Sequence, residues 1–529
     1  MRQLLTHLFL FEDTCNVFVI AGDESAIAID FGSGKWLAEF AALGLPPLQH
    51  IFLTHHHADQ CGGLSHWGND PMTQAHNGSI QVHAPPGEQD FLSPEGIAEF
   101  WRTRRDAGVP RSYSVLPLEV AEQSAPVLNR IQYDMAGWTD LFWGVSRVRF
   151  VHTPGHGPNA VSIIVDVDGR QVVFCGDAAH AGGTVWQPYH LEWDHWTGAG
   201  ALAAWQGIER LRGIGMDLLC PAHGPVIEAG IRPALATLSR RLLNLVRAKG
   251  QIAMGEKDAY APPLRILACG ARQVLPHLYQ FAENSYLLVS DNGEALLIDP
   301  WSRDLDQLDA LLAEIGHPHV AAATATHYHL DHSDGLPIAR AKYGATVWLH
   351  PHVAAPLRDP DGMDVPWPVK AAVLPDYLWP AAGDWQWNEY AFRVGHYPGQ
   401  TWWHAAFMAR IDGLKVLFGG DSFQPPSRWN GTGGFCAYNG SRFREGFMRS
   451  AQTAIDWRPD LVAAGHGTII HFNRAYYRKV MRWAGWAEQV VTALCPTGNL
   501  AADYLSMAGD AVISTTLQQA QTNRHIPGE

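Results

Sequence analysis

Apolar and polar positions follow one order of short runs, and this order occurs twice along the chain. Residues 15–30 (CNVFVIAGDESAIAID) and 283–299 (ENSYLLVSDNGEALLID) each hold an Asn, an apolar run, a polar turn, a second apolar run and an Asp. Two apolar runs around such a turn predict a β-hairpin. Apolar positions at helical spacing follow at 35–43 and 305–315. Each half therefore begins with a predicted hairpin and helix.

The third predicted strand of each half leads into a histidine-rich loop, IFLTHHHADQCGG at 51–63 and AATATHYHLDHSDG at 322–335. Three later landmarks also occur twice: HTPGHGP, FCGDAAH and CPAHGP at 152–158, 174–180 and 220–225, and HYPGQTW, LFGGDSF and AAGHGT at 396–402, 417–423 and 463–468. The interval from the first landmark's His or Gln to the next Asp is 21 residues in both halves. Ordered landmarks at matching intervals predict two tandem domains that arose by duplication.

The two predicted domains span residues 1–255 and 271–529, with a linker at 256–270 that loses periodicity and holds a Pro pair. Helices are expected at 232–249 and 474–494, near the end of each half. The first half carries 28 extra residues, at about 84–140, with a helix expected at 94–107. Such an insertion either shapes a substrate pocket or is a surface elaboration.

Composition narrows the class of protein. The 529 residues are 47% hydrophobic, enough for two or three domains with cores of their own. The net charge is −14 and Lys and Arg form no run, which argues against nucleic acid or an anionic membrane as a partner. Seven scattered cysteines and no apolar run of signal or membrane length favour a soluble cytoplasmic protein. The oligomeric state is not indicated.

A His-x-His-x-Asp-His run at the end of a strand brings several metal ligands into one cleft. The first two His suit one metal ion, and the Asp and last His suit a second. Two more His and a bridging Asp, from the later landmarks, close the site. Imidazole and carboxylate together suit zinc, with iron or manganese as alternatives. Such metals polarise a carbonyl or phosphoryl group and hold a hydroxide nucleophile.

The ordered landmarks of both halves resemble the metallo-β-lactamase superfamily of αββα sandwiches, an α/β (α+β) fold. The resemblance covers nearly the whole chain. It implies metal-dependent chemistry, but the superfamily includes β-lactamases, lactonases, thioesterases such as glyoxalase II, nucleases and iron enzymes. It therefore does not identify a substrate.

The resemblance implies one ligand set in each half. In the first half the matching positions are His55, His57 and His156 for one metal, Asp59, Gln60 and His223 for the other, and Asp177 as the bridge. In the second half they are His327, His329 and Gln400, then Asp331, His332 and His466, with Asp421 as the bridge. Gln60 and Gln400 depart from the family's histidines, at different positions. His396 aligns with the non-ligand His152.

An amide oxygen is a weaker donor than imidazole, so each altered subsite is expected to bind metal at least about tenfold more weakly. One or two zinc ions per domain are expected. The neighbours Cys61 and His404 are alternative donors. Another interpretation is that one half is a degenerate copy that only supports the other. The first half, with three His on one metal and the larger insertion, is favoured as the active one.

Polar residues near the predicted metal sites are candidate substrate contacts. They are His180 and His195 in the first half and Arg428, Tyr438, Asn439 and Arg442 in the second. The histidines can instead support a ligand. Trp residues in likely loops either line a pocket or pack between domains.

The leading hypothesis is a hydrolase of a small ester, thioester, lactone or amide that uses a metal-bound hydroxide. Asp59 or Asp331 is the candidate catalytic residue that orients the nucleophile or moves a proton. One alternative is an iron-dependent oxygenase on the same fold. A second is a binding or scaffold protein with one or both sites degenerate. A small-molecule substrate is the expected partner.

Overall fold

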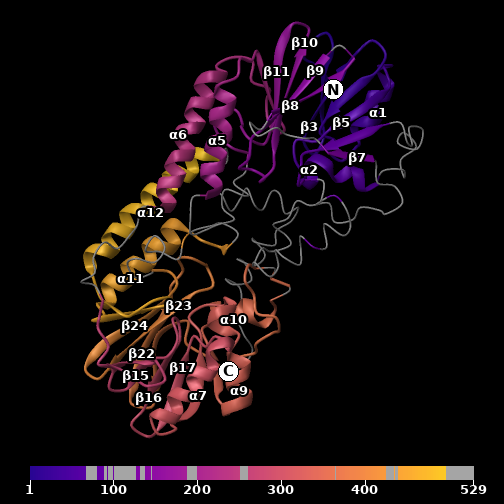
Figure 1. Cartoon of the computed structure of the whole chain (residues 1–529). Coiled ribbons are helices and arrows are strands. Elements are labelled where there is room, and N and C mark those ends of the chain that lie inside the picture. Colours follow the sequence, from indigo (N-terminus) through magenta and orange to yellow (C-terminus); the bar gives the residue numbers. More distant parts are fainter. Residues whose placement is uncertain are drawn as a thin grey trace.

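The computed structural model describes residues 1–66, 80–88, 92, 99, 127–130, 138–144, 146–186, 199–250, 260–360, 362–363, 365–423, 434 and 439–495. Each half of the chain holds two β-sheets, and helices lie between the two halves (Figure 1). Most of the insertion expected at 84–140, including its helix at 94–107, lies outside the described residues.

The first half forms two sheets whose order follows the chain. The first sheet comprises β1 (Arg2–Gln3), β2 (Leu8–Glu12), β3 (Asn16–Ala21), β4 (Ala26–Ile29), β5 (Leu48–Phe52), β6 (Gln81–Ala84) and β7 (Val127–Arg130). The second comprises β8 (Trp138–Trp143), β9 (Ser146–His152), β10 (Val161–Val167), β11 (Arg170–Gly176) and β12 (Leu218–Pro221). The helices are α1 (Trp36–Ala42), α2 (Ala58–Cys61), α5 (Ala199–Arg212) and α6 (Ile231–Gly250), with a 3₁₀ turn at Gly62–His66.

The second half repeats this plan. Its first sheet comprises β13 (Arg265–Ile266), β14 (Arg272–Leu275), β15 (Leu278–Gln280), β16 (Tyr286–Val289), β17 (Glu294–Ile298), β18 (His319–Thr324), β19 (Thr346–Leu349) and β20 (Tyr377–Leu378). Its second comprises β21 (Ala382–Trp387), β22 (Tyr390–His396), β23 (Ala405–Ile411), β24 (Leu414–Gly420), β25 (Leu461–Ala464) and β26 (Ile470–His471). The helices are α7 (Leu305–Glu314), α8 (Leu330–Ser333), α9 (Leu336–Tyr343), α10 (Pro351–Arg358), α11 (Arg449–Trp457) and α12 (Arg474–Leu494), with a 3₁₀ turn at Ser302–Asp304 and a π-helical turn at Phe443–Met448.

Alternating side chains of the strands explain the layers. In β2, Leu8 and Leu10 pack toward the second sheet, whereas Phe9 and Phe11 pack toward α1. Because both faces of the sheet are covered, its strands are apolar at nearly every position. The same pattern in the second half gives a core between its sheets and another beneath α7, α9 and α10. Each half is therefore an α/β sandwich of the αββα type.

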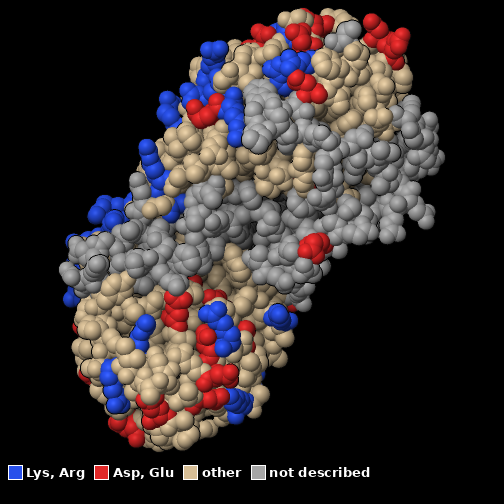
Figure 2. All heavy atoms as spheres, in the orientation of Figure 1, with Lys and Arg blue, Asp and Glu red and all other residues tan. Residues whose placement is uncertain are grey.

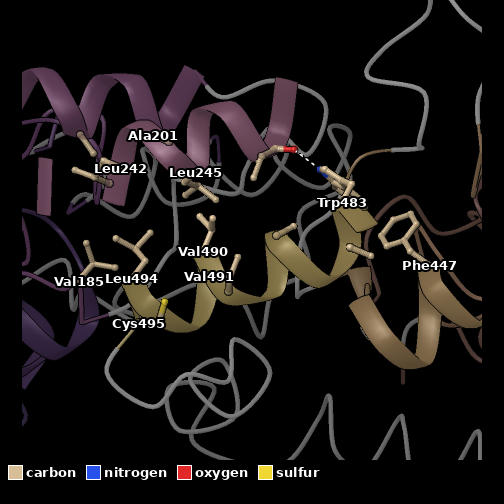
Figure 3. Close-up of a cluster of buried hydrophobic side chains, with 14 of the residues drawn as sticks. Val185, Ala201, Leu242, Leu245, Phe447, Trp483, Val490, Val491, Leu494 and Cys495 are labelled. Atoms are coloured by element: carbon tan, nitrogen blue, oxygen red, sulfur yellow. Dashed lines mark hydrogen bonds between the residues drawn. The ribbon is translucent and has the colours of Figure 1, made fainter. Parts of the chain in front are cut away.

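The outer helices of the two halves share one hydrophobic core. Residues of α5 and α6 pack on the second sheet of the first half, residues of α11 and α12 pack on that of the second half, and all belong to one buried cluster. Leu242 and Leu245 of α6 lie beside Val490 and Leu494 of α12 (Figure 3). The two sandwiches are thus joined through a common helical layer.

Exposed basic side chains gather along this layer. They are Arg232, Arg240 and Arg247 of α6 and Arg474, Arg478, Lys479 and Arg482 of α12. Lys and Arg dominate the edge formed by these helices in the view of Figure 2. The sequence pattern did not show this gathering, because the residues are dispersed along the chain. The exclusion of nucleic acid as a partner stays a prediction.

Several expectations can be compared directly with the structure. The helices expected at 35–43, 305–315, 232–249 and 474–494 are present within one residue at each end. The domain limits stay predictions; within the proposed linker, Ala261 donates its backbone N–H to Ile469 of the second half. Five cysteines of the described residues form no disulfide: Cys15, Cys61, Cys175, Cys220 and Cys269. No described helix is long and apolar enough to cross a membrane.

Candidate metal centres

The first candidate centre begins where β5 ends. His55 and His57 follow this strand, and His156 comes from the loop after β9. All three side chains are buried, and one ring nitrogen of each lies within 4.8 Å of the others. Nε2 of His156 lies 2.9 Å from Nδ1 of His57. Three imidazoles at this spacing have the geometry of a metal site.

A second cluster adjoins the first. Asp59, Asp177 and His223 also place one donor atom each within 4.8 Å of one another. Asp177 comes directly after β11, and His223 follows β12. Oδ1 of Asp177 lies 2.8 Å from Nδ1 of His223, and its Oδ2 lies 3.3 Å from Nε2 of His156. The Asp177 carboxylate therefore lies between the two clusters, as a bridging ligand would.

The second half forms two overlapping clusters. One consists of His327, His332 and Asp421, and the other of Asp331, His332 and His466. The two clusters share His332, whereas the two clusters of the first half share no residue. His329 lies nearby, with its Nδ1 3.0 Å from Nε2 of His327.

Both glutamines contact the bridging carboxylate of their half. Gln60 donates from Nε2 to Asp177 at 2.9 Å, and Gln400 donates from Nε2 to Asp421 at 3.2 Å. The amide carbonyl oxygen Oε1 of each is buried and has no hydrogen-bond partner. A buried carbonyl oxygen without a partner is costly, and a cation would satisfy it.

An Asp and a Thr support the first histidine in each half. Asp30 accepts hydrogen bonds from the backbone N–H and hydroxyl of Thr54, whose hydroxyl is 3.0 Å from Nδ1 of His55. Asp299 and Thr326 make the same contacts in the second half. Asp30 and Asp299 have φ values of 60° and 53°, a conformation that non-glycine residues rarely adopt. Backbone strain repeated at equivalent positions indicates a functional constraint.

The glycine before each bridging Asp allows the strand to approach this Thr. Gly176 and Gly420 have positive φ values of 52° and 49°. A Cβ at Gly176 would lie 2.8 Å from the hydroxyl of Thr54, and one at Gly420 would lie 2.5 Å from that of Thr326. Glycine is required here by close packing as well as by conformation.

Glu88 organises the first centre from outside the motif. Its side chain is fully buried and accepts hydrogen bonds from the backbone N–H and ring of His56. Its other oxygen accepts from the backbone N–H of Asn159, in the loop that carries His156. Glu88 therefore ties together the two loops that supply the histidine cluster.

Asn439 has the corresponding role in the second half. Its Oδ1 accepts from the hydroxyl of Tyr328 and lies 3.1 Å from Nε2 of His329. Because an amide oxygen only accepts, His329 carries its proton on Nε2 and turns the lone pair of Nδ1 toward His327. Asn439 thus orients a candidate ligand.

The two alternative donors have structural contacts. Cys61 donates to the backbone carbonyls of His56 and His57, as Ser333 does to those of Tyr328 and His329. His404 accepts the backbone N–H of Asp421 at Nε2 and stacks on His327. Both side chains therefore help to shape the centres.

The candidate substrate contacts divide into three groups. His180 is half-buried and contacts the turn that carries His223, since a Cβ at Gly224 would lie 2.3 Å from its Nε2. Arg442 is partly buried and donates to the carbonyl of Ser441. Asn439 is fully buried. His195, Arg428 and Tyr438 lie outside the described residues.

The pKa shifts of the histidines differ between the two ligand clusters of the first centre. Burial, together with the neighbouring His156, lowers the pKa of His55 well below its usual value. Burial also opposes the charged form of His223, but Asp177 and Asp59 outweigh it and raise the pKa of His223 well above its usual value. Asp421 and Asp331 raise the pKa of His466 in the same way. In the metal-free protein, the protonated imidazole of His223 or His466 therefore carries the positive charge beside the carboxylates of each Asp/His cluster.

The residues fit metal ions. Nε2 of His55, Oδ1 of Asp59 and Oε1 of Gln60 are buried without a hydrogen-bond partner, and all belong to the first centre. The donors are imidazole, carboxylate and amide, which zinc, iron and manganese accept.

Comparison with known proteins identifies the family. A family model described as "Metallo-beta-lactamase superfamily" matches residues 10–223 and 278–470. The chain belongs to the metallo-β-lactamase superfamily. One matched region lies in each sandwich, and together they contain every candidate ligand.

Two curated relatives match parts of this superfamily member. A hydroxyacylglutathione hydrolase of Albidiferax ferrireducens is 31% identical over 153 residues, which are 28% of this chain and 51% of the relative. The metallo-beta-lactamase fold-containing protein ST1585 of Sulfurisphaera tokodaii is 26% identical over 172 residues, which are 32% of this chain and 59% of the relative. The chain thus spans between half and three-fifths of their length.

Solved structures resemble about half of the chain. A metallo-β-lactamase of Cronobacter sakazakii, described by its HARLDQ motif, is 15% identical, with a TM-score of 0.34 over 47% of this chain and 94% of its own. The archaeal superfamily protein ST1585 of Sulfolobus tokodaii is 19% identical, with a TM-score of 0.33 over 48% of this chain and 91% of its own. These similarities concern the fold alone.

Sequence reasoning did not identify the residues that support the ligands. Glu88 lies in the insertion, 32 residues from His56, and no motif marks it. Asp30 and Asp299 could have been found, because both end the repeated hairpin. Asn439 stays a candidate substrate contact, and its Oδ1 lies 3.1 Å from Nε2 of the candidate ligand His329.

Proposed function

We propose that this protein is a metal-dependent hydrolase of a small ester, thioester, lactone or amide, with its active site in the first half. The supporting observation is that the two ligand clusters of the first half share no residue, whereas those of the second half share His332. We therefore infer that the first half can hold two metal ions and the second half one. Catalysis that uses both ions of a pair belongs to the first half.

When bound, zinc ions would polarise the substrate carbonyl and make a water molecule nucleophilic near neutral pH. The chain supplies the proton acceptor. The Asp59 side chain is 20% exposed, while those of Asp177 and His55 are each 1% exposed. Asp59 is thus the carboxylate of this cluster that solvent reaches, and its Oδ2 is 3.2 Å from Nε2 of His223. We assign it the role of orienting the water and accepting its proton.

The second half keeps the same arrangement around a single cluster. The Asp331 side chain is 23% exposed, and its Oδ2 is 3.2 Å from Nε2 of His466. Asp331 is therefore the equivalent proton acceptor. With one metal ion, this half has a weaker site or a supporting role.

The substrate class rests on the relatives. The name of one relative, a hydroxyacylglutathione hydrolase, supports testing thioesters first among the candidate substrates. Esters and lactones have the same electrophilic carbonyl and should be assayed after thioesters.

Metal content is the first measurement. The full chain is purified without added metal, and metals per chain are counted by mass spectrometry for the parent protein, His55→Ala and His327→Ala. His50→Ala is the matched control, because His50 lies on β5 but outside the clusters. The proposal predicts about three zinc ions, with two dependent on the first half. Thioester, ester, lactone and amide hydrolysis are then assayed, and His55→Ala should abolish activity.

Other outcomes favour the other functions. Iron as the main metal, with oxygen consumption in place of hydrolysis, would favour the oxygenase. No stoichiometric metal in any preparation would contradict both enzymatic functions and favour a binding or scaffold protein.

A further inference from the structure

Helix α12, the last described helix of the second half, ends on a loop of the first half's candidate centre. The carbonyl oxygen of Leu494, the last residue of α12, accepts the backbone N–H of Val185 at 2.9 Å. Val185 and Leu494 are both buried, with exposed fractions of 4% and 1%. Figure 3 shows them side by side at the junction of the two halves. This hydrogen bond therefore joins two segments that are distant in sequence, and it is shielded from solvent.

The loop that contains Val185 also packs on α6 of its own half. Arg241 donates to the carbonyls of Gly182 and Gly183. A Cβ at Gly183 would lie 2.4 Å from the carbonyl oxygen of Ala234, so the loop backbone rests directly on the helix. The loop of residues 180–186 is thus held by α6 on one side and by the end of α12 on the other.

This loop carries the ring that covers His223. Trp186 follows Val185, and its ring stacks on the imidazole of His223 with a centroid distance of 4.7 Å and an interplanar angle of 5°. His223 in turn directs Nδ1 toward Asp177 and Nε2 toward Asp59. A flat indole against the imidazole fixes the plane in which both nitrogens point. Among the described residues, His466 of the second half has no stacked indole; its ring contact is edge-on with His332.

A second contact fixes the angle between the helices. Nε1 of Trp483 in α12 donates to the carbonyl oxygen of Ala248 in the last turn of α6 at 2.8 Å (Figure 3). Both residues are buried in the shared helical core. With one bond near each end of the interface, α12 has a defined position relative to the first half.

We propose that α12 of the second half supports the metal centre of the first half. Its last carbonyl positions the loop of residues 180–186, and this loop holds Trp186 flat against the ligand His223. Trp186 and Leu494 are positioning residues that act across the domain boundary. This inference rests on the proposed function only in taking His223 as a metal ligand.

Zinc affinity in the full chain tests the proposal. The measured quantity is the affinity of the zinc ion that depends on His223, which is the ion lost in His223→Ala. Chelator competition determines this affinity in a His466→Ala background, which removes the site of the second half. Trp186→Ala removes the stacked ring, and Leu494→Ala removes the buried side chain that packs the end of α12 in the same cluster as Val185. Each variant should weaken this zinc by about tenfold or more, as is typical when support for a ligand is removed. The double variant should be no weaker than either single one, because both act through the same contact. Trp186→Phe, which keeps an aromatic ring, should restore most of the affinity.

Val480→Ala is the matched control. Val480 is fully buried in the same helix and core, about 20 Å from Leu494 at 1.5 Å per residue. It should leave the zinc affinity of the first half unchanged. Equal loss in Val480→Ala, additive losses in the double variant, or failure of Trp186→Phe to restore binding would each overturn the proposal.

Hydrogen exchange provides a reading that needs no metal and no substrate. In the metal-free protein, the peptide spanning residues 180–186 should exchange about tenfold faster in Leu494→Ala than in Val480→Ala, since the partner of the Val185 amide is loosened. Equal exchange in the two variants would contradict the cross-domain contact. Failure to find a hydrolysed substrate would affect the proposed function but not these results.

Discussion

The side-chain amide of Gln60 donates a hydrogen bond of 2.9 Å to Oδ2 of Asp177, the carboxylate between the two ligand clusters of the first half. Gln400 makes the equivalent contact with Asp421, although it occupies a different ligand position. A carboxylate only accepts, so each Nε2 faces it and each Oε1 faces away. The substitution of histidine by glutamine therefore keeps a contact with the bridging residue and leaves one weak donor oxygen.

Restoring histidine at position 60 should strengthen the Asp/His cluster of the first half. Gln60 corresponds to His332, whose Nδ1 is 3.2 Å from Oδ2 of Asp299. Asp30 is the first-half equivalent of Asp299 and would be the partner of a histidine at position 60. We expect Gln60→His to bind the second zinc of this half about tenfold more tightly or better. Chelator competition in the His466→Ala background measures this change. Unchanged affinity would mean that the Gln60 carbonyl oxygen is already an adequate ligand.

Gln400→His should add a metal ion to the second half. This variant places a third imidazole beside His327 and His329, where the first half has His156. We expect the metal content of the second half to rise from one ion to two, counted by mass spectrometry in a His55→Ala background. Gln400→Asn, which keeps an amide but shortens it, is the control and should add none. A content of one ion in both variants would contradict the two-subsite arrangement.

Zinc binding to the second half should release protons. The carboxylates of Asp331 and Asp421 overcome burial and raise the pKa of His332 to about 10, and the pKa of His466 is also raised. Both imidazoles are protonated at pH 7 in the metal-free protein, and a metal binds only the neutral form. Affinity should therefore rise with pH up to about 10, with about two protons released per zinc at pH 7.

The histidine cluster of the first half should behave differently. Burial lowers the pKa of His55 well below its usual value, so this ring is neutral at pH 7. Calorimetric titration in two buffers of different ionisation enthalpy measures the protons released in each half. Release of equal numbers of protons from the two halves would contradict the assigned protonation of their histidines.

Asn439→Ala should weaken metal binding through His329. Removal of the amide takes away the acceptor that holds the proton on Nε2 of His329. We expect a loss of about 10- to 100-fold in the affinity of a site that contains this histidine. Gln400→His is the background for this measurement, since it completes the three-His cluster. Tyr328→Phe is the control: it removes the other donor to Asn439 and should have a smaller effect.

Glu88→Ala should destabilise the first half. It leaves the buried His56 ring and the backbone N–H groups of His56 and Asn159 without their acceptor. A buried hydrogen-bond donor that loses its acceptor costs about 1–3 kcal/mol of unfolding free energy. Chemical denaturation measures this loss. Glu39→Ala, at an exposed helical position of the same half, should change stability by less than about 0.5 kcal/mol.

Much of the candidate site was predictable from the sequence because ligand residues stand at element ends. His55 and His57 follow β5, Asp177 follows β11 and His223 follows β12, and each position is marked by a repeated motif. The ends of adjacent strands meet at one edge of a sandwich, so order along the chain was enough to bring these residues together. The second-half equivalents followed from the matching intervals.

The role of neighbouring side chains was not predictable. Cys61 and Gln60 are adjacent in the chain, and both were plausible donors. The structure turns Sγ of Cys61 to the backbone carbonyls of His56 and His57, while Gln60 faces Asp177. Side-chain direction depends on the packing of the short helix α2, which spans four residues and has no periodicity that a sequence can show.

The sequence by itself determined the duplication, the helix that spans Arg474–Leu494 and the order of the ligands, because these depend on spacings of a few residues or on repeated motifs. Only the tertiary structure decided that the halves share one helical core and that Leu494 contacts Val185 beside Trp186. An amphipathic helix shows in its sequence that one face will be buried, but not against which partner. That choice depends on the packing of whole sandwiches, which brings together surfaces separated by hundreds of residues.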